Sequence, residues 1–223
     1  MKERKAMITP VFVTFTGADD RTDVTRMDEI ARRWVGADGQ PLVEWGILFS
    51  HSNRDARYPC KQAVDEMLGA AGRKAAHLCG GHGRNVSLFG KVDPAVPLGR
   101  FGRCQVNGRD VDRDNLRGVA ERHGVSAIVQ TQAPAFPDDD RCGFLFDASG
   151  GNGVFPDAVP PRPGFLVGYA GGMGPDTVAR YLGMIEAAGG DGAFWIDMEG
   201  KLRRGGWFDL DAVERVLDAV YGG

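Results

Sequence analysis

Residues 145–155 read LFDASGGNGVF, an apolar run that ends on Asp147 and passes into three closely spaced glycines. A buried strand that ends on an acid, followed by backbone without side chains, is typical of a strand end that faces a ligand. The same letters also fit a sharp turn in which the aspartate accepts hydrogen bonds from its own backbone. Which interpretation applies depends on the fold to which this strand belongs.

Seven other segments have the same character and are spread along the whole chain. They are short and apolar, contain β-branched or aromatic residues, and mostly end on a small or polar residue. In chain order the eight segments are 11–17, 43–50, 75–81, 101–108, 126–133, 143–150, 165–172 and 193–200. Continuous apolar runs of this length predict strands that are buried on both faces, as in a parallel sheet.

Amphipathic helical patterns lie between these strands. Apolar residues three and four positions apart mark one face of a helix. The stripes are Met27–Ile30–Ala31–Trp34, Val64–Met67–Leu68–Ala71, Leu116–Val119–Ala120, Val178–Tyr181–Leu182–Ile185 and Leu210–Val213–Leu217–Val220. Asp209 is placed to cap the last of these helices. Residues 85–99 and 154–164 contain glycine and several prolines, so we predict no lasting helix in either.

Eight strand–helix units in 223 residues, without a shift in composition, predict an α/β fold of one domain over residues 1–223. The fold that fits best is a single (β/α)8 TIM barrel. A doubly wound open sheet is the alternative, because it has the same local alternation. The count of eight and the helix after the last strand favour the closed barrel.

The composition disfavours several classes of partner. The formal net charge is −3 and the arginines are scattered among acids, so we predict no nucleic-acid partner. Residues 1–5 are charged like the start of a signal peptide, but Thr9 and Pro10 interrupt the apolar segment that a signal peptide needs after such a start. No run approaches the ~20 apolar residues of a membrane span. We therefore expect a cytoplasmic protein without a membrane partner, and leave its oligomeric state open, with a homodimer as one alternative.

The cysteines and histidines give no metal or disulfide motif. Cys60, Cys79, Cys104 and Cys142 contain no CxxC pair, so we predict buried thiols in a reducing compartment. The stretch HLCGGHG (77–83) brings His77, Cys79 and His82 close together, and such ligands suit zinc. No matching ligand pair stands elsewhere at a recognised spacing, so we favour hydrogen-bonding histidines and predict neither a metal nor a cofactor.

In a barrel, the carboxyl ends of the strands build the ligand site. Polar or charged residues at these ends are Thr16, Arg54, Arg57, Cys79, Gln105, Asn107, Asp147, Asp197 and Glu199. Glycines after the sixth and seventh strands can offer backbone N–H groups to an anion. They are Gly151, Gly153, Gly171 and Gly172. The sequence therefore predicts a small anionic or sugar-like ligand, with phosphate binding at the glycine turns.

Several of these segments resemble the phosphoribosylanthranilate isomerase family of tryptophan biosynthesis. The resemblance is most specific in FDASGGNGVF (146–155), YAGGMGPDTV (169–178) and WIDMEGKLRRGGWFDLDAVERVL (195–217), and is weaker in WGILFSHSNRDARYP (45–59) and CQVNG (104–108). It implies a (β/α)8 barrel and an Amadori rearrangement, which converts a phosphoribosyl amine from its aldose to its ketose form.

The resemblance also implies roles for particular residues. Asp147 matches the general acid after the sixth strand, whereas Thr16 stands where the family has its catalytic cysteine. A threonine hydroxyl does not ionise near neutral pH without a partner base, so we name Cys79 as an alternative base. Arg57, with Arg54 as its rival, matches the arginine that holds the anthranilate carboxylate.

Two further departures bear on the substrate, and two functions stay open. Glu199 replaces a small residue beside the expected phosphate site, and Asn107 replaces a histidine. The leading hypothesis is aldose–ketose isomerisation of a sugar-phosphate or sugar-amine. The alternative is a barrel without catalysis that binds a small anionic metabolite. A lyase is disfavoured because no predicted strand before residue 200 contains a lysine for a Schiff base.

Overall fold

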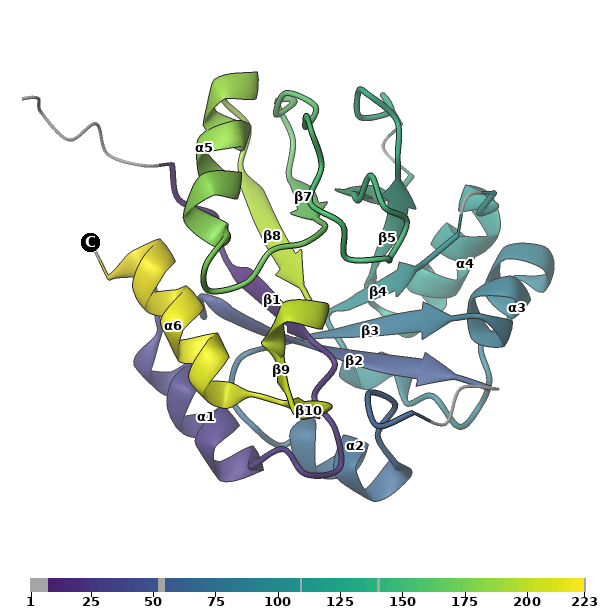
Figure 1. Cartoon of the computed structure of the whole chain (residues 1–223). Helices are drawn as coiled ribbons and strands as arrows, with labels where there is room; N and C mark the ends of the chain where they lie inside the picture. The colour runs from purple at the N-terminus through teal and green to yellow at the C-terminus, as the bar shows by residue number, and fades with distance from the viewer. Residues whose placement is uncertain (1–7, 52–54, 109, 140, 223) are drawn as a thin grey trace, which may run out of the picture.

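A computed structural model describes residues 8–51, 55–108, 110–139 and 141–222, and it shows eight parallel strands closed into a barrel (Figure 1). The strands are β1 (Val13–Thr16), β2 (Val43–Ser50), β3 (Arg73–Cys79), β4 (Arg103–Val106), β5 (Ser126–Thr131), β6 (Gly143–Phe146), β7 (Val167–Ala170) and β8 (Phe194–Met198). Each strand pairs with its neighbour in the chain, and β1 pairs with β8, with Val13 opposite Ile196. The predicted barrel is confirmed and the open sheet is excluded.

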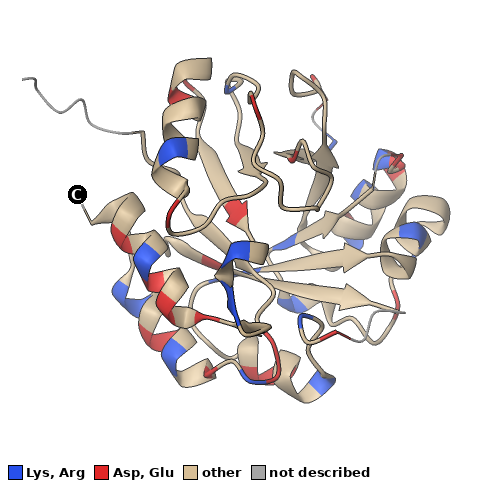
Figure 2. Cartoon of the chain, viewed as in Figure 1, with Lys and Arg blue, Asp and Glu red and all other residues tan. Residues whose placement is uncertain are grey.

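The helices surround the barrel and bury the predicted apolar stripes. They are α1 (Val24–Arg33), α2 (Lys61–Met67), α3 (Gly81–Phe89), α4 (Arg113–His123), α5 (Val178–Ala188) and α6 (Leu210–Tyr221). Asp209 caps α6 as predicted, since its carboxylate accepts from the N–H groups of Asp211 and Ala212. Basic and acidic residues alternate on the outer helices α1 and α6 (Figure 2), where Arg26 pairs with Asp211 at 2.6 Å.

The two segments predicted to lack a helix differ in outcome. The prediction is wrong for residues 85–99, because α3 begins at Gly81, before that segment, and runs to Phe89. Gly90 ends it in the left-handed conformation that glycine adopts at helix ends. Residues 154–164 form no helix, as predicted, and the link from β5 to β6 has none among its described residues. A 3-10 turn, η2 (Gly200–Leu202), and a hairpin of β9 (Arg203–Arg204) and β10 (Trp207–Phe208) follow β8.

An ion pair that the sequence analysis missed is buried inside the barrel. Glu44 on β2 accepts a hydrogen bond from Thr14 on β1 at 2.8 Å, and Arg103 Nε donates to its other oxygen at 2.9 Å. The Arg103 guanidinium also lies 4.2 Å from the ring centre of Trp195. Gly168 makes room for this indole, because a Cβ there would lie 2.3 Å from it. The hydrogen bonds compensate for burying both charges.

One cysteine and one lysine differ from the predictions made for them. Cys60 is exposed, so the prediction of buried thiols is wrong for it, although Cys104 and Cys142 are buried. Lys74 belongs to β3, so a strand before residue 200 does contain a lysine. Its ammonium donates to the carbonyl oxygens of residues 70–72, at the amino end of the barrel, away from the strand ends that face the ligand.

No helix in the described part of the chain is long and apolar enough to cross a membrane.

Candidate functional site

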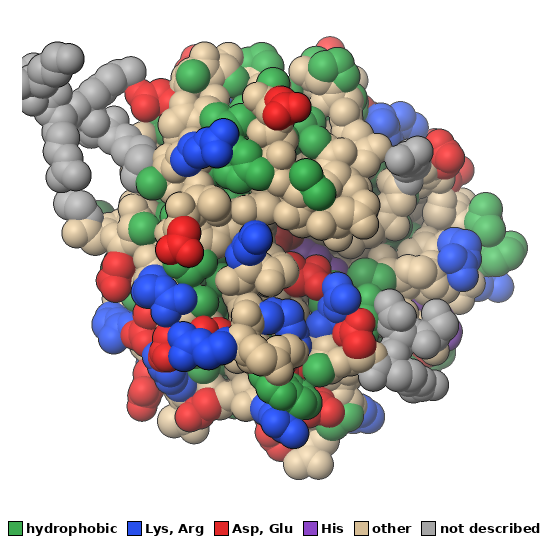
Figure 3. Space-filling view, viewed as in Figure 1, with side chains coloured by type: hydrophobic (Ala, Val, Ile, Leu, Met, Phe, Trp, Pro, Cys, Tyr) green, Lys and Arg blue, Asp and Glu red, His purple; other side chains and the backbone are tan. Residues whose placement is uncertain are grey.

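A cavity of about 330 Å³ opens at the carboxyl ends of the strands. Figure 3 shows it near the centre of the view, with acidic and histidine side chains inside it. Its lining residues include Thr16, Arg57, Gln105, Asn107, Asp147, Gly151, Gly153, Gly171, Gly172, Asp197 and Glu199. These are all the predicted site residues except Cys79, which is not among the lining residues, and Arg54, which lies outside the described residues. Volumes of this size suit a small metabolite.

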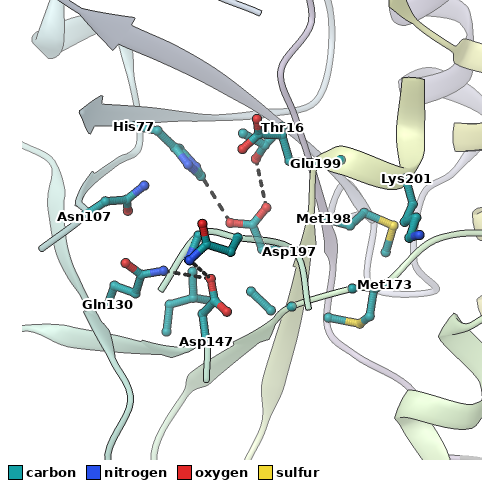
Figure 4. A pocket seen from close by; sticks show the side chains of 18 of the residues that line it. Thr16, His77, Asn107, Gln130, Asp147, Met173, Asp197, Met198, Glu199 and Lys201 are labelled. Carbon is teal, nitrogen blue, oxygen red and sulfur yellow. Dashed lines mark hydrogen bonds and ion pairs between the residues drawn. The ribbon is translucent and has the colours of Figure 1, made fainter. Parts of the chain in front are cut away.

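The cavity floor carries a buried carboxyl group bonded to the first strand. Asp197 on β8 is 6% exposed, and its Oδ1 accepts a hydrogen bond from Thr16 Oγ1 at 2.8 Å (Figure 4). Burial raises the pKa of Asp197 to about 7, and the hydrogen bond from Thr16 opposes this rise. Near neutral pH the group is therefore present in both protonation states, which suits proton transfer.

His77 faces Asp197 from β3. Its Nε2 lies 4.0 Å from Asp197 Oδ2, too far for a hydrogen bond, and this buried nitrogen has no partner among the described residues. Its Nδ1 lies 3.4 Å from the amide nitrogen of Gln105, and with that nitrogen as donor Nε2 carries the proton. Burial lowers the pKa of His77 to about 4, so the ring is neutral. The unpaired Nε2–H points into the cavity, where an acceptor atom of a ligand can accept a hydrogen bond from it.

Gly46 on β2 allows these groups to converge. A Cβ at this position would lie 2.2 Å from Thr16 Oγ1 and 3.0 Å from His77 Nε2. The sequence predicted a hydrogen-bonding histidine at His77 without assigning it to the site, and it gave no role to Gly46. The pairing register supplies the missing signal, because it places Gly46 opposite Thr16 on one side and next to β3 on the other.

Asp147, on the far side of the cavity, is held by four hydrogen-bond donors. Its Oδ1 accepts from the backbone and hydroxyl of Ser149, at 3.0 and 2.7 Å. Its Oδ2 accepts from Gln130 Nε2 at 2.8 Å and from the N–H of Gly151 at 2.6 Å. Both oxygens of Asp147 therefore act as hydrogen-bond acceptors. Asp147 thus caps its own turn, as the second interpretation of LFDASGGNGVF has it, and it also lines the cavity. That it faces a ligand stays a prediction.

Arg57 reaches the cavity from the loop after β2 and pairs with Glu199. Arg57 NH1 donates to Glu199 Oε1 at 3.0 Å, and its Nε donates to Asp55 at 3.0 Å. Burial raises the pKa of Glu199, and the guanidinium opposes that rise. Glu199 also keeps Arg57 engaged, so the carboxylate of a ligand would compete with two protein carboxylates for this cation.

The glycine turns pack on each other as well as lining the cavity. Gly172 has φ +66°, and a Cβ there would lie 2.6 Å from the backbone nitrogen of Phe155. A Cβ on Gly171 would lie 3.0 Å from the carbonyl oxygen of Val154. Gly151 and Gly153 also have positive φ, but a Cβ on either would meet no atom within 4 Å. Close packing thus accounts for Gly171 and Gly172 without a ligand, whereas Gly151 and Gly153 face open space.

The second predicted base, Cys79, lies outside this arrangement. Its thiol is 3.9 Å from the amide nitrogen of Asn107, whose own side chain lines the cavity. Burial raises the pKa of Cys79 to about 11, so little thiolate exists at neutral pH. Neither property suits a base that acts on a ligand in the cavity.

Three basic residues, Lys201, Arg203 and Arg204, follow Glu199 in the chain, and of these Lys201 lines the cavity (Figure 4). Arg203 instead donates to Asp19 and to the carbonyl of Gly17, and Arg204 pairs with Asp209 at 2.9 Å. No ion pair engages Lys201 among the described residues. Gln130 and Lys201 stand at or after strand ends in the sequence, but neither was among the predicted site residues.

A second cavity of about 480 Å³ adjoins the first between the loops after β4, β5 and β6. The two share Asn107, Gln130 and Asn152. Amide side chains therefore form the boundary, and they supply both donors and acceptors to a ligand.

The fold is similar to that of N-(5'-phosphoribosyl)anthranilate isomerase from Pyrococcus furiosus, with a TM-score of 0.57 and 12% sequence identity. The match covers 96% of this chain and 100% of that one. No family model matches the sequence, and no curated protein matches it. The resemblance predicted from the motifs is therefore confirmed as a likeness of structure, and at this identity it shows the fold alone.

Proposed function

We propose that the chain is an isomerase that moves a proton between neighbouring carbons of a small sugar-phosphate or sugar-amine, as in aldose–ketose conversion. The observation that carries this proposal is the buried Asp197 carboxyl in the cavity floor, with its pKa near 7 and its hydrogen bond to Thr16. General bases and acids work best when their pKa lies near the operating pH.

The chemistry needs one group that removes a proton from C2 and returns one to C1. In the open-chain aldose or its imine, the base removes the C2 proton while O1 or the imine nitrogen gains a proton, which gives an enediol or an enaminol. Protonation of C1 with loss of the O2 proton then gives the ketose or aminoketose, so protons are only moved and no oxidant or cofactor is consumed. We assign the base role to Asp197, because Thr16 cannot act as a thiolate does and instead orients the carboxyl. The Nε2–H of His77 is placed to donate to the substrate oxygen that gains charge.

The role of Asp147 as general acid stays a prediction. Its carboxylate already accepts from four donors, so it would take up and release a proton only after a ligand displaced one of them. A ligand hydroxyl that replaces Gln130 would do this while keeping both oxygens bonded. The proposal therefore depends on Asp197 first and on Asp147 second.

The charges in the cavity limit the substrate class. Glu199 and Arg57 neutralise each other, which leaves Lys201, among the described residues that line the cavity, as the cation available to an anionic group. The turns at Gly151 and Gly153 line the same cavity, where backbone N–H groups can contact phosphate oxygens. A small sugar with one phosphate, or one with an amine near Glu199, fits this arrangement.

Deuterium incorporation tests the proposal without a prior choice of substrate. The full chain is incubated in D2O with N-(5'-phosphoribosyl)anthranilate, other aldose phosphates and glycosylamines, and proton NMR follows the C2–H signal. We expect a ketose that carries deuterium at C1 for at least one compound, and loss of this activity in Asp197→Asn. Asp191→Asn changes an exposed aspartate and serves as the control. Equal turnover in Asp197→Asn and Asp191→Asn would refute the assignment.

Binding without turnover is the second candidate, and the four donors on Asp147 favour it. In that case a compound of the panel stabilises the fold in a thermal-shift titration but neither exchanges C2–H nor changes its structure. Stabilisation at ~100 times the dissociation constant amounts to about 2.7 kcal/mol, which is readily measured.

A further inference from the structure

We propose that His51, His82 and Asp93 form a binding site for a divalent transition metal, such as Zn²⁺, at the rim of the barrel. One ring nitrogen of each histidine and one carboxylate oxygen of Asp93 lie within 4.8 Å of one another. His51 follows β2, His82 lies in the first turn of α3, and Asp93 lies in the loop after α3. Figure 1 shows α3 and the end of β2 at the right of the view. None of the three lines the barrel cavity.

Asp93 and His51 already face each other. The Asp93 Oδ1 accepts from the N–H of Ala95 at 2.8 Å, which fixes the carboxylate. Its Oδ2 lies 3.5 Å from His51 Nε2. A Cβ at Gly81 would lie 2.9 Å from the ring of His51, so the glycine makes room for the imidazole against the start of α3.

His82 provides the independent sign that something is bound here. It is 8% exposed, and its Nδ1 is buried without a hydrogen-bond partner among the described residues. Buried polar atoms are rarely left unpaired, and an ion or an ordered water is a usual explanation.

The chemistry of the ligand set selects the class of metal. Two imidazoles and one carboxylate suit zinc and other late first-row metals, whereas Mg²⁺ and Ca²⁺ prefer oxygen ligands. The two rings are stacked, with centres 3.8 Å apart and planes inclined by 29°. Since lone pairs lie in the ring planes, coordination requires the His51 ring to turn, and its side chain is 42% exposed. The charge of Asp93 offsets the unfavourable placement of a cation near the start of a helix.

Competition for Zn²⁺ tests the proposal on the full chain. The protein is stripped with a chelator and titrated with Zn²⁺ against a chromogenic chelator, and bound metal is counted by mass spectrometry. We expect one Zn²⁺ per chain, no competition from Mg²⁺, and visible d–d bands of a four-coordinate site when Co²⁺ replaces Zn²⁺. His82→Gln and Asp93→Asn should each weaken binding by more than tenfold, since even loss of an outer partner costs about 10- to 100-fold.

Control variants separate this cluster from other potential ligands. His123→Gln changes an exposed histidine on α4, and Cys60→Ser removes the exposed thiol, so both should bind Zn²⁺ like the wild type. Circular dichroism of the metal-free variants checks that each is folded. Undiminished binding in Asp93→Asn and His82→Gln, or binding lost instead in His77→Gln or Cys79→Ser, would overturn the proposal. A chain that binds no Zn²⁺ would overturn it too, and an ordered water would then be the partner of His82.

Discussion

Thr16 donates to Asp197 at 2.8 Å and thereby links the two strands at which the barrel closes, although 181 residues separate them. In the resembled family a cysteine stands at the position of Thr16. The hydroxyl cannot replace its thiolate, but it holds the buried carboxyl in one orientation and lowers its pKa from the value that burial alone would give. In our proposal the base is therefore a residue of β8, Asp197, and not the residue of β1 that serves as base in the resembled family.

Thr16→Val should raise the pKa that controls activity. The substitution keeps the shape of the side chain and removes the hydrogen bond that stabilises the Asp197 carboxylate. With Asp197 as the base, the acidic limb of the pH profile of kcat/KM should move to higher pH by about one unit, the order expected for one hydrogen bond. The measurement is the pH profile of the isomerase assay or, before a substrate is known, the titration of Asp197 by carboxyl NMR.

Thr25→Val is the matched control, because Thr25 is exposed on α1 and contacts neither the cavity nor Asp197. If Thr16→Val retains activity and the acidic limb of its pH profile of kcat/KM does not move, the pKa of Asp197 does not control that profile.

Asp197 and His77 should have opposite effects on stability between pH 4 and 7. The pKa of Asp197 is raised from 3.8 to about 7, so the native state binds the extra proton and stability is lost as the pH rises through this window. The pKa of His77 is lowered from 6.5 to about 4, so stability is gained as the pH rises from 4 to 6.5. At 1.36 kcal/mol per unit, shifts of about 3 and 2.5 units correspond to roughly 4 and 3 kcal/mol.

Urea unfolding at several pH values separates these two contributions. In Asp197→Asn the free energy of unfolding should rise with pH relative to the wild type, because the His77 contribution is no longer opposed. In His77→Gln it should fall with pH relative to the wild type. Three parallel curves would mean that neither group titrates as burial predicts.

Gly172→Ala should destabilise the fold much more than Gly151→Ala. Both residues have positive φ, which costs a residue with a side chain about 1–2 kcal/mol. Only at residue 172 would the new Cβ also meet backbone, 2.6 Å from the nitrogen of Phe155, which should add a packing cost of about 1–3 kcal/mol. Thermal or urea unfolding measures the difference. Equal losses in the two variants would show that the glycine loops do not pack as described.

The sequence allowed prediction of those site residues that stand at the carboxyl ends of strands. Asp147, Thr16 and Asp197 could be assigned to one mouth because all parallel strands of a barrel end at the same face. Their bonding could not be predicted, since the four donors on Asp147 and the approach of Thr16 to Asp197 depend on register and on rotamers. The role of Gly46, which leaves room for Thr16 on β1 and His77 on β3, could not be predicted because it depends on how those two strands pair with β2.

Errors in the fold prediction have a local and a long-range cause. The glycines and prolines within residues 85–99 led to the prediction that this segment forms no helix. The helix α3 begins before the segment, at Gly81, and only its last five residues, 85–89, fall within it. The pairing of Glu44 with Arg103 joins two strands that are not neighbours, so no pattern along either strand reveals it. His51 and Asp93 likewise meet His82 only through the tertiary structure.

Lys201→Gln should weaken the binding of anions to the cavity. Lys201 lines the wall beside Gly174, where a Cβ would lie 2.4 Å from the Lys201 Cβ, so the backbone of the lysine is held close to the turn after β7. Since Arg57 is engaged by Glu199, loss of Lys201 removes the remaining cation of the described cavity lining, and we expect about tenfold weaker binding of inorganic phosphate, or about 1.4 kcal/mol.

Thermal-shift titration with phosphate at low and at physiological salt measures this effect, because salt screens an exposed ammonium and should reduce the difference. Lys61→Gln is the control, since Lys61 is exposed on α2 and pairs with Asp65 in the next turn. Loss of phosphate binding in Lys201→Gln together with retained binding of an uncharged sugar would place the anionic end of the substrate at β7 and β8. Unchanged phosphate affinity would instead mean that the cavity accepts its ligand through Glu199 and the amides, and that the substrate is not a phosphate.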